Sequence, residues 1–179
     1  RFQYNNAIRD LFRLNKDIFP LTEKLMARHV NYLHSRHDVM PDTVQVSCHA
    51  LMPSTGFEDV QSYPKDLRAS HGFDNQANQL TLSPLLLDAY LRLSLSIVDS
   101  PDFKPQNVGI WNSFFDAPAK DADIEEEVRR RLGSLMQRAF RSTVEVDALD
   151  RYTQYTVAKL DQGLSFTASM KKVASAILC

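Results

Sequence analysis

The sequence is poor in cysteine, in long apolar runs and in charge of one sign. Only two cysteines occur in 179 residues, so no disulfide framework holds the fold. No apolar run approaches the roughly 20 residues that a membrane-spanning helix needs, and no membrane span is expected. The net charge of −1 argues against a nucleic-acid or anionic-membrane binder, because both need a strongly basic surface.

Several common catalytic signatures are missing as well. The chain contains no Gly-x-x-x-x-Gly-Lys-Ser/Thr, no Gly-x-Gly-x-x-Gly and no Gly-x-Ser-x-Gly pattern. Phosphate-cradling loops and the nucleophile elbow of hydrolases therefore have no support. What is present is an ordinary globular composition, with 44% hydrophobic and 24% charged residues. A chain of this length can bury about 70% of its unfolded surface, so we expect a genuine core.

Both ends of the sequence fall inside apolar patterns. The sequence begins at Arg1 without a methionine and stops at Cys179, directly after Ala-Ile-Leu. Natural termini are usually polar and loose. We therefore expect this chain to be a piece of a longer protein.

Apolar residues recur at helical spacing along most of the chain, which predicts a mainly α fold. The stripes predict helices at about residues 4–12, 21–37, 84–98, 124–139, 146–160 and 166–177. Pro84 suits the first position of its helix, and Ser83 and Ser165 are N-cap candidates. The helix at 84–98 is apolar on almost every side, which predicts a central, buried position. The expected architecture is a multi-helix bundle of about six helices.

Residues 38–82 break this helical pattern with prolines, glycines and scattered apolar residues. Alternating apolar positions at 44–50 predict a short strand, and residues 80–82 are a second candidate. We expect a long irregular insertion with one or two short strands. A loop of this length is uncommon and often functional.

The chain divides into three predicted parts. Residues 1–98 form an N-terminal helical module with the irregular loop 38–82, residues 99–121 a connector, and residues 122–179 a three-helix module with short links. The connector carries Trp111, Phe114 and Phe115, so we expect it to pack against the core. In the C-terminal module, residues 125–131 hold three Glu–Arg pairs at i,i+4 spacing, which predict a solvated helix face.

Histidines are the first candidates for metal chemistry. His34 and His37 are three residues apart on a predicted helix, a spacing that can ligate zinc or iron. A metal site needs three or four ligands, and no further ligand pattern completes this one, so surface histidines are the simpler interpretation. His49 follows Cys48, but Gln45 takes the place of the first cysteine of the Cys-x-x-Cys-His haem signature. Haem attachment to this chain is not expected.

A polar turn before the helix at 84–98 is the most interesting candidate site. It comprises His71, Gly72, Phe73, Asp74 and Asn75. Asp74 and Asn75 could ligate Ca²⁺, cap a helix or bind sugar hydroxyls, and His71 could act as a general base. A turn whose side chains only satisfy buried backbone groups is the alternative.

Two stretches resemble domains of unknown function. Residues 2–11 (Phe-Gln-Tyr-Asn-Asn-Ala-Ile-Arg-Asp-Leu), 72–75 (Gly-Phe-Asp-Asn) and 80–87 (Leu-Thr-Leu-Ser-Pro-Leu-Leu-Leu) resemble a domain found in large exported proteins with planctomycete-type cytochrome c domains. Residues 130–179 resemble a second domain of the same proteins, on the segments 138–141, 163–166 and 174–178.

The resemblance implies an exported or periplasmic bacterial protein that is linked to haem and to polysaccharide use. It places the haem on a separate domain and no cofactor in this chain, with Ca²⁺ or Zn²⁺ left open. The implied partners are other domains of the same polypeptide, including a cytochrome c domain, and polysaccharide. The resemblance supplies no established catalytic residues.

The first helix is expected to support the polar turn. Its candidate residues are Tyr4, Asn5, Asn6, Arg9 and Asp10. The last four are placed on the polar side of the helix, opposite the apolar stripe. We expect them to hydrogen-bond the turn at residues 72–75 and to fix its conformation.

Three functions follow from these observations. The leading prediction is a non-catalytic helical module that packs against or docks other domains of a larger haem-linked protein. One alternative is part of a redox or carbohydrate-active enzyme with a site near residues 41–75. The other is a metal- or sugar-binding module without catalysis.

Overall fold

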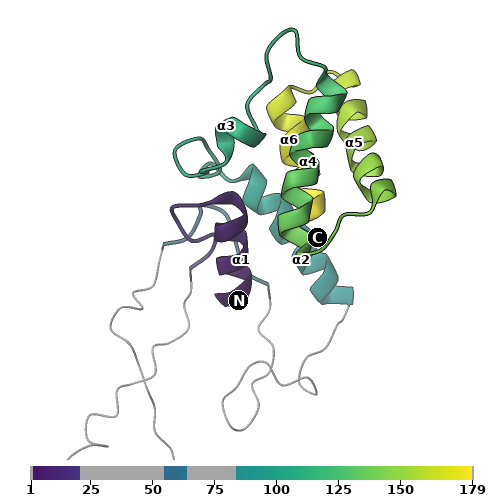
Figure 1. Ribbon diagram of the computed structural model, residues 1–179. Helices are drawn as coiled ribbons and strands as arrows, with labels where there is room; N and C mark the ends of the chain where they lie inside the picture. The colour runs from purple at the N-terminus through teal and green to yellow at the C-terminus, as the bar shows by residue number, and fades with distance from the viewer. Residues whose placement is uncertain (1, 21–54, 64–83, 179) are drawn as a thin grey trace, which may run out of the picture.

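The structure is a computed structural model that describes residues 2–20, 55–63 and 84–178. The described residues are mainly helical, as predicted (Figure 1). The helices are α1 (Phe2–Phe12), α2 (Pro84–Asp99), α3 (Trp111–Phe114), α4 (Ile124–Phe140), α5 (Val146–Asp161) and α6 (Phe166–Ile177). No strand occurs within these ranges, where only an isolated bridge joins Leu14 to Val108. The predicted helix at 21–37 and the strand candidates at 44–50 and 80–82 lie outside them.

The last three helices pack as an antiparallel group, in which α5 contacts both α4 and α6 (Figure 1). Their bounds agree with the sequence pattern within a residue. Side-chain caps fix two starts: Asp123 accepts a hydrogen bond from the Glu126 N–H at 3.1 Å, and Ser165 accepts one from the Ala168 N–H at 3.2 Å. These caps satisfy backbone donors that the first helical turn leaves without a partner.

The connector at 99–121 packs into the core, as its aromatic residues predict. It contains the short helix α3, which the apolar pattern did not reveal. Phe103 and Phe115 are completely buried, and their rings pack edge to face with centres 5.2 Å apart. The ring of Phe12 in α1 packs against Phe103 in the same way, with centres 5.5 Å apart. The buried side chains thus form one cluster that extends from α1 to α6. The division into parts at residues 98 and 121 stays a prediction.

Residues 55–63 cover the segment that follows α1. Gly56 has φ +68°, and a Cβ on it would lie 2.7 Å from Pro20 Cδ. Only glycine fits this close approach without strain. The turn places Phe57, Val60 and Tyr63 in the core, and Tyr63 reaches α2 and α1 there.

The position of α2 differs from the prediction. Its second half is buried against α6, as expected of an apolar helix. Its first half extends beyond the bundle (Figure 1), and Leu85, Leu87 and Leu91 are 69%, 53% and 49% exposed. The prediction of a buried helix was wrong there, because α6 covers only part of the length of α2.

The charged run of α4 is not simply a solvated face. Arg131 is buried and pairs with Glu127 at 2.7 Å, as its spacing predicts. Arg130 also pairs with Glu127, at i,i+3 spacing, and Arg129 pairs instead with Asp150 of α5. The predicted pairs 125–129 and 126–130 are therefore wrong, because tertiary partners and shared carboxylates compete with the local spacing.

Glu127 makes stability depend on pH. Hydrogen bonds from Arg130 and Arg131 lower the pKa of Glu127 from 4.5 to about 2. The contribution of this carboxylate is therefore complete above pH 4.5 and is lost as the pH falls towards 2. We expect Glu127→Gln to reduce the loss of stability between these pH values, measured by urea unfolding. Glu126→Gln, next to it on an exposed position, should leave the acid profile unchanged, and equal profiles for both variants would contradict this assignment.

Within the described ranges, no helix combines the length and the apolar character needed to cross a membrane.

Candidate functional site

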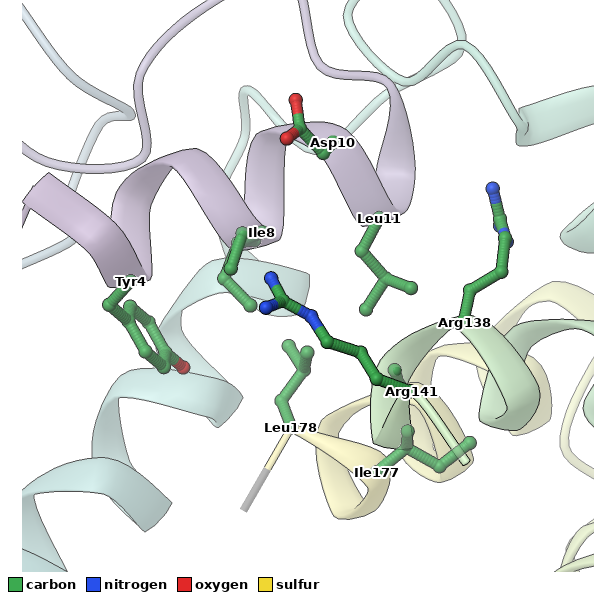
Figure 2. Close-up of a pocket in the computed structure, with 10 residues that line it drawn as sticks. Tyr4, Ile8, Asp10, Leu11, Arg138, Arg141, Ile177 and Leu178 are labelled. Atoms are coloured by element: carbon green, nitrogen blue, oxygen red, sulfur yellow. The ribbon is translucent and has the colours of Figure 1, made fainter. Parts of the chain in front are cut away.

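A groove lies at the junction of α1, α4 and α6 (Figure 2). Its volume is about 390 Å³. The described residues that line it are Tyr4, Ala7, Ile8, Asp10, Leu11, Arg138, Ala139, Arg141, Ile177 and Leu178. The groove therefore joins the first helix of the chain to the ends of two helices that are far away in sequence.

The apolar part of the groove follows from two helical stripes. Ile8 and Leu11, three residues apart, share one face of α1 and are almost completely buried. Ile177 and Leu178 close the opposite wall at the end of α6. Both stripes belong to the hydrophobic core, so the apolar wall of the groove is the edge of that core.

The charged part comes from the end of α4. Arg138 lies in the last turn, and Arg141 follows the helix in the left-handed conformation, with φ 51° and ψ 30°. A left-handed residue commonly ends a helix, and here it turns the chain towards α5. In Figure 2 the guanidinium groups flank Leu11, with Arg141 reaching towards Ile8 and Arg138 on the other side.

Among the described residues, the ion pairs of arginines lie outside the groove. Carboxylates pair with Arg9, Arg92, Arg129, Arg130 and Arg131. In the described part of the chain, by contrast, neither arginine of the groove has an ion pair or a side-chain hydrogen bond.

Two further charged side chains, Arg13 and Asp10, lie near the two arginines of the groove. Arg138 is exposed; its partial desolvation, and then the charge of Arg13 just after α1, lower its pKa. Asp10 lines the groove, but its carboxylate points away from the apolar side chains (Figure 2). The arginines therefore leave a local excess of positive charge beside an apolar wall.

Two residues of the predicted supporting helix hold the turn that follows it in the sequence. Asn5 is completely buried; its Oδ1 accepts from the Ile18 N–H at 2.9 Å, and its Nδ2 donates to Asp17 Oδ1 at 2.8 Å. Arg9 Nη1 donates to the same Asp17 oxygen at 2.9 Å. Asn5 and Arg9 thus hold the turn that follows their own helix. The polar side of the helix on which Asn5 was placed is buried at this position, because this turn folds back over it.

The other residues of this helix differ in their surroundings. Asn6 and Asp10 are exposed. Tyr4 is half-buried in a cluster with Tyr63 and Tyr90. The ring centres of these two tyrosines lie 5.7 and 5.5 Å from the ring centre of Tyr4. This tyrosine cluster joins α1, α2 and residues 55–63 at one end of the groove.

The remaining predicted site residues lie outside the described ranges. They are His71, Gly72, Phe73, Asp74 and Asn75 of the polar turn, and His34, His37 and His49. The expected hydrogen bonds between α1 and the turn at 72–75 stay a prediction. Within the described ranges, no three His, Cys, Asp or Glu side chains gather in a way that could hold a metal ion.

Sequence reasoning missed the arginine groove. Arg138 and Arg141 are not among the candidate residues that the sequence motifs indicate. Of the acids of α4, Glu127 pairs with Arg130 and Arg131. The available signal was two arginines at the end of a predicted helix without an acid at i±3 or i±4 of Arg138.

Comparison with known proteins gives one match. Residues 51–100 match the model of PSD3, a family described as a protein of unknown function (DUF1587). This stretch contains residues 55–63 and all of α2, and hence Tyr63 and Tyr90. No curated protein and no solved structure matches the chain. The chain therefore contains a stretch similar to a domain of unknown function.

Proposed function

We propose that the chain is a non-catalytic helical module of a larger exported, haem-linked protein and that it docks the cytochrome c domain of that protein. The resemblance of residues 2–11 and 130–179 to domains of such proteins supports this proposal. The match at residues 51–100 to a domain of unknown function is compatible with it.

The exposed leucines of α2 are the observation that carries the docking proposal. Leu87 and Leu91 are one turn apart and therefore lie on the same side of the helix, and Leu85 is the most exposed of the three. They sit on the half of α2 that extends beyond the bundle (Figure 1). Clustered apolar side chains on a surface typically mark a site of protein interaction.

The test is association with the haem-loaded cytochrome c domain of the same polypeptide. Sedimentation of the two purified proteins is followed by haem absorbance, and we expect the haem to sediment with the chain. Leu87→Glu should weaken the complex about tenfold or more, because a charge would be buried at the contact.

Val146 of α5 supplies the matched control. It is 64% exposed, and Val146→Glu adds the same charge on a different helix, so association should not change. The proposal fails if no complex forms, if both variants weaken it equally, or if the complete polypeptide encodes no cytochrome c domain.

A further inference from the structure

We propose that the groove between α1, α4 and α6 binds a small carboxylate with an apolar body. This inference goes beyond the docking proposal, since it concerns a different surface and a different kind of ligand. It rests on the combination of two guanidinium groups without partners among the described residues and an apolar wall at the edge of the core.

The charge of the groove selects for an anion. Guanidinium groups bind carboxylates through paired, charge-assisted hydrogen bonds. Arg138 and Arg141 lie on either side of Leu11 (Figure 2), and Arg13 adds its charge nearby. Asp10 is the one acidic residue among the described lining residues, and its carboxylate points away.

The wall of the groove selects for an apolar body. Ile8, Leu11, Ile177 and Leu178 present hydrocarbon to the space between the helices. A volume of about 390 Å³ lies at the lower end of ligand pockets, which range over roughly 300–1,000 Å³. A bare inorganic anion would leave this apolar surface in water, whereas a carboxylate with a short hydrocarbon chain would cover it.

A purely structural role for the arginines makes a different prediction. Cations at the end of a helix stabilise its dipole, and Arg138 lies in the last turn of α4. In that case, replacing Arg138 would change thermal stability without any ligand dependence. Ligand binding and thermal stability must therefore both be measured.

Octanoate is the probe, and octanamide and inorganic phosphate are the comparisons. Titration calorimetry of the purified chain should show saturable binding of octanoate. Octanamide has the same hydrocarbon chain without the charge, and its affinity should be lower by a factor of about ten or more. Phosphate has the charge without the hydrocarbon and should not compete.

Variants of the groove separate the two parts of the site. Arg138→Gln and Arg141→Gln should each weaken octanoate binding about tenfold. Ala7→Phe should abolish it by filling the groove with both arginines intact. Arg151→Gln removes an exposed arginine of α5 outside the groove and should bind octanoate like the original protein.

The inference is overturned if octanoate does not saturate the chain or if octanamide binds equally well. It is also overturned if the groove variants keep full affinity, including the case where Arg138→Gln lowers only the thermal stability. Leu87→Glu, on the exposed half of α2, should leave octanoate binding unchanged, so a failure of docking and a failure of this site can be told apart.

Discussion

Replacing Arg131 by methionine should lower the free energy of unfolding by about 3 kcal/mol. Arg131 is only 7% exposed. Its Nη1 donates to the carbonyl oxygens of Phe114 and Asp116 at 3.0 and 2.7 Å, and its Nε donates to Glu127 at 2.7 Å. Methionine fills a similar volume but leaves the two carbonyl groups and part of the carboxylate without their donor.

The same side chain also joins two distant parts of the fold. The Arg131 guanidinium lies 5.1 Å from the ring centre of Phe166, the first residue of α6. Through Phe114 and Asp116 it holds the end of the connector against α4. Its loss should therefore destabilise the whole core rather than one helix. We expect the variant to unfold in a single cooperative transition.

Arg130→Met is the matched control for this measurement. Arg130 donates to the same Glu127 carboxylate, but its side chain is 65% exposed. Exposed ion pairs typically contribute about 0–1 kcal/mol, so urea unfolding should show a small loss. Similar losses for the two variants would mean that the buried contacts of Arg131 do not hold the connector.

Replacing Asn5 by leucine should lower the free energy of unfolding by about 2 kcal/mol. Leucine has nearly the shape of asparagine but cannot accept the hydrogen bond from the Ile18 N–H or donate to Asp17. Because Asn5 and Ile18 are both completely buried, water cannot replace the lost partner. An unsatisfied buried backbone donor is one of the more expensive consequences of a point mutation.

Asn6 gives a control of the same residue type at the next position. It is exposed, and Asn6→Leu should change the free energy of unfolding by less than about 0.5 kcal/mol. Urea unfolding of both variants at neutral pH measures the difference. An equal effect at the two positions would contradict the role of Asn5 in holding the turn after α1.

The helical pattern predicted much of the described fold. Helices at 124–139, 146–160 and 166–177 were expected from apolar spacing and are observed as α4, α5 and α6. The cap at Ser165 and the start of α2 at Pro84 were also predicted from local chemistry. The helix α3 was missed because a helix of a single turn contains too few residues to show a period.

The candidate site was predicted less well. The polar residues of α1 were among the candidates, but their expected partner at residues 72–75 lies outside the described ranges. Asn5 and Arg9 bind Asp17, which is close in sequence but follows a turn that helical spacing does not describe. The arginine groove needs α1 to meet the ends of α4 and α6, and no local pattern contains that information.

The sequence by itself determined the longer helices of the described ranges and which of their faces are apolar. These properties depend on residues three or four positions apart and on caps within one turn. Only the tertiary structure decided that Asn5 and Arg131 are buried, that the first half of α2 is exposed, and that Arg138 and Arg141 flank an apolar groove. The reason is physical: burial and ion pairing depend on which distant elements touch, and exposed and buried residues of one type look the same in a sequence.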